Sequence, residues 1–158
     1  MIGMALGLAW GMALIFIGTV YVRIPIFSFN WMLALAFLLA AIVPLLVIAR
    51  QAARRFFDDT LIDGQPYLPG SPGDIDARVL QNSIEQLVLA MAVWPAAGTL
   101  LVTSGPGVVL MLGGGFLISR LAFWGGYHLS PPLRAFGFAA SFYPTIIVLV
   151  WALAIWII

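Results

Sequence analysis

Long apolar runs alternate with short polar breaks along the whole chain. Five of these runs approach or exceed the ~20 residues that a helix needs to cross a bilayer. The pattern therefore predicts five membrane-spanning helices, over residues 2–22, 31–49, 77–101, 108–128 and 133–158. Because proline removes an intrahelical hydrogen bond, we expect Pro95 to interrupt the third helix.

The one substantial polar segment lies between the second and third predicted helices. Residues 51–76 hold five of the six acidic residues, and their middle, DGQPYLPGSPGD, is typical of an irregular loop. We expect Asp74 or Asp76 to cap the third helix, because a short carboxylate accepts the unpaired N–H groups at a helix start. The sequences TSGPG and SPP predict the two remaining tight turns.

Composition places the chain in a lipid bilayer. Of its 158 residues, 63% are hydrophobic and 8% are charged, whereas a soluble domain carries about 25% charged residues. A net charge of +1 argues against nucleic acid as a partner. The chain has no cysteine, hence no disulfide, no thiolate metal site and no cysteine nucleophile of its own. We interpret the lone His128 as a boundary residue and expect no metal site.

The arginines predict how the chain is oriented. The N-terminal run lacks a basic segment and a clear cleavage site, so we interpret it as a retained membrane helix. With five spans, one membrane face receives only Arg23. The positive-inside rule makes the other face cytoplasmic, with the N-terminus inside and the C-terminus outside. If the first run does not span, the N-terminus lies outside and the arginine-rich face stays cytoplasmic. The arginines of that face are Arg50, Arg54, Arg55, Arg78 and Arg134, with Arg120 approaching it.

A polar stripe on the third helix is the most informative feature of the sequence. In RVLQNSIEQLVLAMAVW, the spacing puts Arg78, Asn82 and Glu85 on one helical face. A charged side chain at membrane depth costs roughly 2.5–3.5 kcal/mol on insertion scales. We therefore expect the stripe to pack against a partner or to line a polar site.

A second polar group is predicted at the same membrane boundary. Arg120 and Tyr127 are seven residues apart on one face of the fourth helix, and Arg134 opens the fifth. A purely structural interpretation stays open for all these residues. The arginines could snorkel to lipid phosphates, the stripe could bond between helices, and Tyr127 stands where interfacial tyrosines are common.

The two motifs resemble a known family. RVLQNSIEQ resembles the R-x-x-x-N-x-x-E signature of the MAPEG family (membrane-associated proteins in eicosanoid and glutathione metabolism). SRLAFWGGYHLSPPLRAFGF is similar to its second diagnostic stretch, in which Arg, Tyr and Arg follow at intervals of seven. The resemblance covers about residues 45–158. It implies an all-α integral membrane protein, with a MAPEG-like four-helix bundle over residues 31–158 and an extra N-terminal transmembrane helix with its link over residues 1–30.

The resemblance also implies a ligand and an assembly. The family is expected to form a homotrimer in membrane lipid, with glutathione between neighbouring subunits near the cytoplasmic face, here of a bacterial inner membrane. By this resemblance Glu85 takes the amino group of glutathione, arginines take its carboxylates, and Tyr127 lies along the tripeptide. Arg134 matches the arginine that stabilises the thiolate and is the catalytic candidate. The implied glutathione-binding residues are Arg50, Arg78, Asn82, Glu85, Arg120 and Tyr127.

The sequence therefore predicts a membrane-bound glutathione-dependent transferase or peroxidase acting on hydrophobic small-molecule electrophiles. An arginine favours the thiolate of a thiol whose pKa is otherwise ~8.5. Phe123 and Gln86 depart from the family pattern, since eicosanoid-pathway members often have tyrosine at both positions. One alternative is a non-catalytic trimeric membrane protein that binds a lipid or small ligand in the same pocket. A transporter or channel is disfavoured, because the polar residues form no path across the membrane.

Overall fold

The computed structural model describes residues 1–157, which form five long helices and one short 3-10 helix. Each long helix is long and apolar enough to cross a membrane. The predicted all-α membrane architecture, with one helix ahead of a four-helix bundle, is confirmed. The elements are α1 (Ile2–Val20), η1 (Ile26–Ser28), α2 (Phe29–Phe57), α3 (Pro72–Leu100), α4 (Gly105–Leu129) and α5 (Pro131–Ile157).

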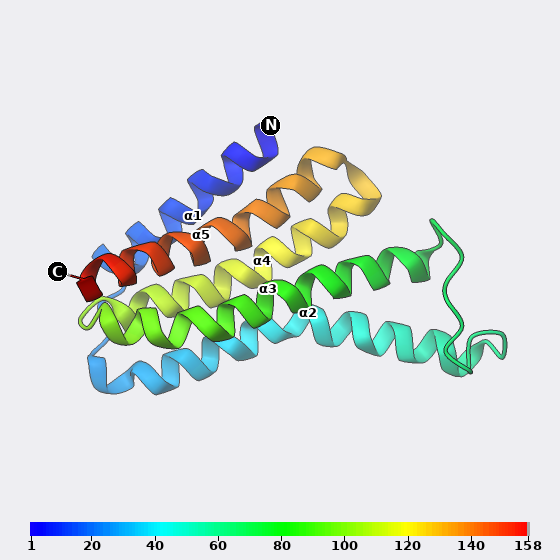
Figure 1. Ribbon diagram of the computed structural model, residues 1–158, viewed down its shortest axis with the longest axis horizontal. Helices are drawn as coiled ribbons and strands as arrows, with labels where there is room; N and C mark the ends of the chain where they lie inside the picture. Colours follow the sequence, from blue (N-terminus) through cyan, green and yellow to red (C-terminus); the bar gives the residue numbers. More distant parts are fainter. Residues whose placement is uncertain (158) are drawn as a thin grey trace.

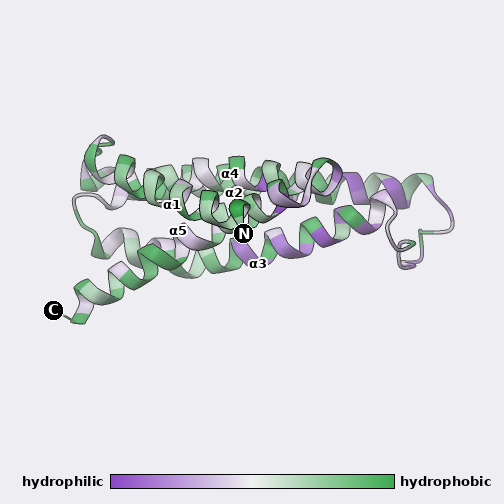
Figure 2. Cartoon of the chain, turned by 90° about the horizontal axis from the view of Figure 1, so that it is seen from above, coloured by the Kyte–Doolittle hydropathy of each residue, from purple (hydrophilic) through white to green (hydrophobic). Residues whose placement is uncertain are grey.

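The helices lie side by side along one long axis (Figure 1). Helices α1, α3 and α5 run in one direction and α2 and α4 in the other, so the α2–α3 and α4–α5 connections lie at the same end. Figure 2 shows that hydrophilic residues gather toward this end, while the rest of the bundle is largely hydrophobic. We call it the arginine-rich end, defined by Arg50, Arg54, Arg55, Arg78 and Arg134.

The polar connection between α2 and α3 is shorter than predicted, because both helices extend beyond their apolar segments. Helix α2 continues to Phe57 and α3 begins at Pro72. The expectation that Asp74 or Asp76 caps α3 was wrong. The cap is Ser71, whose hydroxyl accepts a hydrogen bond from the Asp74 N–H at 3.3 Å. With proline tolerated in the first turn, the helix starts early enough to place both aspartates inside it.

Two further expectations about prolines and turns were wrong. Helix α3 runs without interruption through Pro95, and the Thr99 hydroxyl donates to the Pro95 carbonyl at 2.8 Å. Pro95 offers no N–H to the carbonyl of Met91, and membrane helices tolerate this loss. In TSGPG only Thr103 and Ser104 belong to the turn, since α4 already begins at Gly105.

Helix α1 packs along α5 and against α4, and contacts neither α2 nor α3 within the described chain. Gly3, Gly7 and Gly11 recur every four residues and form the contact with α5. A Cβ at Gly7 would lie 2.5 Å from the Cβ of Ala139, and one at Gly11 would lie 2.8 Å from Cγ of Pro144. The backbones approach this closely only because these positions carry no side chain.

The main core lies between α2, α3, α4 and α5, with Trp94 of α3 at its centre. The Trp94 ring stacks on Phe37 at a centroid distance of 5.7 Å and meets Phe116 edge-on at 6.0 Å. Its indole N–H donates to the Thr145 hydroxyl at 3.2 Å. A buried tryptophan needs such a partner for its N–H. These contacts fix α3 against α4 and α5, the helices that carry most of the candidate site.

Candidate functional site

The polar stripe of α3 lies at the edge between the buried and exposed sides of the helix. Arg78 and Glu85 are exposed, whereas Asn82 is half-buried. Arg78 forms an ion pair within the helix, with Nη2 2.9 Å from Oδ2 of Asp74. Glu85 accepts a hydrogen bond from Nε2 of Gln81 at 2.7 Å. In a single chain, the charges of the stripe therefore lie on the outer surface of the bundle.

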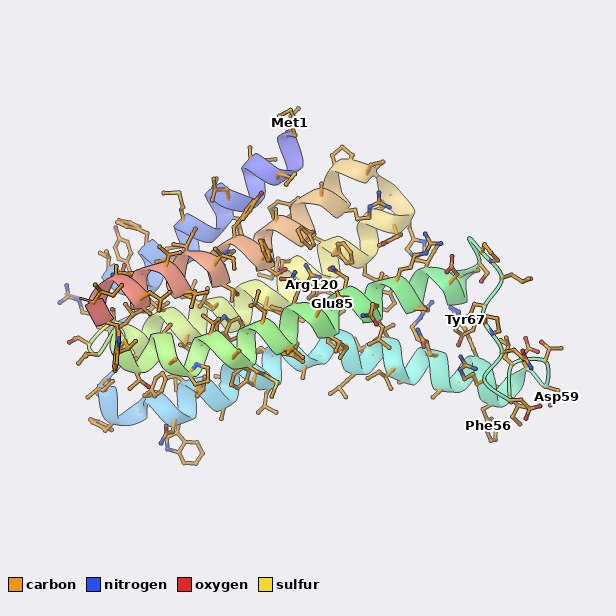
Figure 3. All side chains as sticks on the ribbon, in the orientation of Figure 1. Met1, Phe56, Asp59, Tyr67, Glu85 and Arg120 are labelled. Atoms are coloured by element: carbon orange, nitrogen blue, oxygen red, sulfur yellow. The ribbon has the colours of Figure 1, made fainter. Side chains whose placement is uncertain are left out.

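Arg120 of α4 is completely buried and ties three helices together. Its Nη1 donates to the side-chain oxygen of Asn82 at 2.8 Å. Its Nη2 donates to the backbone carbonyl of Gly137 at 2.6 Å and to the hydroxyl of Ser141. In Figure 3, Arg120 lies in the middle of the bundle, close to the α3 segment that carries Glu85. Arg120 thus orients Asn82, the one member of the stripe that faces inward.

The charge of Arg120 has no carboxylate partner within 4.0 Å in the described chain. Instead its guanidinium lies over the rings of Phe123, 4.7 Å from the centroid, and Phe116, at 5.6 Å. Ring faces and hydrogen-bond acceptors stabilise a desolvated cation in this way. Arginine suits the position because its guanidinium stays charged when buried.

Arg134 and Tyr127 meet where α4 turns into α5. The guanidinium carbon of Arg134 lies 4.9 Å from the centre of the Tyr127 ring. Tyr127 in turn packs edge-on against Phe123 at 5.5 Å, so this pair is joined to the Arg120 group through one shared ring. A Cβ at Gly126 would lie 2.3 Å from the backbone nitrogen of Arg134. That glycine therefore lets the first turn of α5 sit against α4, which brings the exposed arginine over the tyrosine.

The sequence analysis missed a fourth group, centred on Asp76. This carboxylate is 1% exposed. It forms ion pairs with Nε of Arg50 at 3.1 Å and with Nη2 of Arg54 at 3.0 Å. It also accepts a hydrogen bond from the indole N–H of Trp124 at 3.0 Å. The guanidinium carbon of Arg50 lies 5.2 Å from the Trp124 ring centre. The sequence did contain a signal for this group. Arg50 and Arg54 are four residues apart, so they share one face of the helix and could share an acidic partner.

A comparison with models of known protein families shows which family the chain belongs to. A model of the MAPEG family matches residues 27–154. The chain belongs to the MAPEG family. No curated protein and no solved structure matches the chain significantly. The match confirms the resemblance seen in the two motifs and makes this an integral membrane protein of a family of glutathione and eicosanoid metabolism.

The MAPEG match covers α2 to α4 and most of α5, and it leaves α1 outside. Within this MAPEG protein, the first motif lies on α3 and the second runs from α4 into α5. The fold pairs Asn82 with Arg120 and Tyr127 with Arg134. The exposed Arg78 forms no hydrogen bond with either pair in the described chain and is paired with Asp74 instead. In the described residues no group of His, Cys, Asp or Glu has the arrangement of a metal site.

Proposed function

We propose that this MAPEG protein is a glutathione-dependent transferase or peroxidase acting on hydrophobic electrophiles in the bilayer. The observation that carries the proposal is the set of charged side chains that α2, α3 and α5 leave exposed, apart from the aspartates of the α2–α3 connection. Three are cations, Arg50, Arg78 and Arg134, and one is a carboxylate, Glu85. Glutathione offers two carboxylates, one ammonium group and one thiol, which complement such a set.

Arg134 is the proposed catalytic residue. A thiol of pKa ~8.5 is mostly protonated at neutral pH, and a neighbouring guanidinium favours its thiolate. Arg134 lies in the first turns of α5, where the positive end of the helix dipole adds to this effect. Its stacking on Tyr127 holds it in place before the thiol arrives.

The reaction follows from the thiolate. In the transferase reaction the thiol proton passes to water, the sulfur forms a bond to an electrophilic carbon, and the leaving group departs or a strained ring opens. In the peroxidase reaction the thiolate attacks the terminal oxygen of a hydroperoxide and the O–O bond breaks. The alkoxide takes up the proton that the thiol lost and leaves as an alcohol. A second glutathione then displaces water from the sulfenic acid and forms the disulfide. Both reactions need an apolar acceptor, which the surrounding lipid delivers.

We propose that the active form is a homotrimer with glutathione between neighbouring copies. Glu85 is exposed on α3, within a surface that also carries exposed Ile84, Val88 and Met91. A carboxylate facing lipid at this depth is costly, and a second copy would cover it. The remaining partners of the site, Arg50 on α2 and Arg134 on α5, would then come from the same copy or from its neighbour.

We propose that the site faces the cytoplasm of a bacterial-type inner membrane. Five of the seven arginines lie in the parts of α2, α3 and α5 next to the α2–α3 and α4–α5 connections. Arg23 lies in the α1–α2 connection, which Figure 1 shows at the other end of the bundle. The positive-inside rule assigns the arginine-rich end to the cytoplasm. Glutathione is then drawn from the cytoplasmic pool.

Turnover by the detergent-purified full chain tests the proposal. The assay follows glutathione conjugation to a chlorodinitrobenzene probe and reduction of an organic hydroperoxide. We expect turnover that Arg134→Ala lowers by about 10²-fold, the scale for loss of one electrostatic stabiliser. Arg23→Ala, which removes an exposed arginine at the opposite end, should leave turnover unchanged. Glutathione binding without turnover would instead support the non-catalytic ligand-binding protein.

A further inference from the structure

Two arginines pair with the single negative charge of Asp76. Asp76 is one carboxylate, 1% exposed, and it forms ion pairs with two arginines of α2. Arg54, with 26% of its side chain exposed, is the more buried of the two and by itself balances the charge of Asp76. Arg50 is therefore a second, uncompensated cation at the same junction. Because half of the Arg50 side chain is exposed, this charge is available to an anion from outside the chain.

The free part of Arg50 has the form of an anion receptor. Only its Nε contacts Asp76, and its two Nη atoms donate no hydrogen bond within the described chain. Its side chain is 50% exposed, so the Nη edge is accessible. Two planar Nη groups match the two oxygens of a carboxylate, and this geometry makes arginine the usual residue for such recognition.

The orientation of Arg50 is fixed from two directions. The Asp76 carboxylate holds Nε at 3.1 Å, and the Trp124 ring lies 5.2 Å from the guanidinium carbon. Trp124 is itself held, because its N–H donates to the other oxygen of Asp76 at 3.0 Å. The three side chains come from α2, α3 and α4, so the receptor depends on the packing of three helices. A receptor ordered in advance loses less conformational entropy on binding.

From these contacts we infer that Asp76 and Trp124 are positioning residues that hold Arg50 as a receptor for one carboxylate of glutathione. The inference rests on the proposed function, and it adds to it a specific role for two residues that need not touch the ligand. Asp76 fixes the direction of the guanidinium, and Trp124 fixes its plane. We expect the loss of either residue to weaken glutathione binding, and to do so only for ligands that carry the carboxylate that Arg50 contacts.

Calorimetric titration of glutathione into the detergent-purified full chain tests the inference. We expect Asp76→Asn to raise the Kd at least tenfold. Trp124→Phe keeps the ring and removes the N–H, so it should raise the Kd about threefold. Asp63→Asn removes the same charge from an exposed loop position, and Trp156→Phe makes the same ring change at an exposed site; neither should alter the Kd.

Two ligand analogues separate positioning from a general loss of structure. One is γ-glutamylcysteine, which lacks the glycine carboxylate, and the other is glutathione without its glutamyl α-carboxylate. We expect Asp76→Asn and wild type to bind one of the two analogues equally well, because that analogue lacks the group that Arg50 contacts. If Asp76→Asn does not fold, Trp124→Phe must show the same dependence on the analogue.

The outcomes that overturn the inference differ from those that overturn the proposed function. Wild-type binding together with an unchanged Kd in both variants would overturn the inference alone. The same holds if the variants lose affinity for glutathione and both analogues by one common factor. No binding of glutathione to the wild-type protein would overturn the proposed function and the inference with it.

Discussion

At the scale of single residues, Arg120 is the clearest case of a charge that the fold accommodates without a counter-charge. Its acceptors are one amide, one backbone carbonyl and one hydroxyl, and aromatic rings cover its faces. Removing one partner of a buried charged donor leaves that donor unsatisfied. The partner most open to such a test is Asn82, which belongs to the family signature and lies on a different helix.

We predict that Asn82→Leu lowers the free energy of unfolding by about 1–3 kcal/mol, the cost of an unsatisfied buried group. The reason is that Nη1 of Arg120 loses its acceptor while the charge stays buried. Unfolding in detergent, followed by circular dichroism, measures the change. Gln81→Leu, on the exposed surface of the same helix, is the control and should change stability little. Equal stability of both variants would contradict this account of Arg120.

The residue scale also shows what the sequence could and could not predict about the site. The sequence placed the polar residues of α3 and α4 at one membrane boundary, and the structure adds that Asn82 and Arg120 are in contact. The role of Asp76 was missed, because its position near the start of α3 suggested a cap. Only the packing of α2 and α4 against α3 reveals that this aspartate is buried with three donors.

At the scale of helices, the apolar pattern predicted the number and order of the elements well. It failed at their ends, because α2 and α3 extend beyond their apolar segments as amphipathic helices. Arginine is a good helix former, so the arginines that end an apolar run do not end the helix. The glycines of α1 were visible in the sequence, yet only the structure shows that Gly3, Gly7 and Gly11 pack on α5.

We predict that Gly7→Ala destabilises the protein by about 1–3 kcal/mol, because the new methyl group overpacks the contact with Ala139. Gly114→Ala is the matched control, since a Cβ there has no neighbour within 4 Å. That change should be neutral or slightly stabilising, because alanine favours helix over glycine. Thermal unfolding midpoints compare the two variants. A larger loss in Gly114→Ala than in Gly7→Ala would show that α1 does not pack on α5 as described.

At the scale of the whole molecule, α1 covers parts of the α4–α5 side of the bundle but, within the described residues, not the side formed by α2 and α3. The four-helix unit leaves Arg78 and Glu85 of the α3 stripe exposed. An exposed carboxylate among apolar side chains is a costly surface for lipid but a suitable one for a protein contact. The proposed trimer therefore uses α3, and α1 faces the lipid.

We predict that Val88→Trp weakens the trimer, because the larger ring would occupy the space of the neighbouring copy. Met12→Trp on α1 is the matched control, since Val88 and Met12 are both 60% exposed in the single chain. Native mass spectrometry from detergent should give three copies for the wild type and for Met12→Trp, and fewer for Val88→Trp. A monomeric wild type, or equal dissociation of both variants, would contradict an α3 interface.

The central claim is that Arg134 stabilises the thiolate of bound glutathione, and the ultraviolet absorbance of that thiolate tests it most directly. Glutathione is mixed at neutral pH with the detergent-purified wild type, with Arg134→Ala and with Arg23→Ala as the control. The account predicts a thiolate band in the wild type and in Arg23→Ala, and none in Arg134→Ala. A band of equal strength in Arg134→Ala, or no band in any of the three proteins, would contradict it.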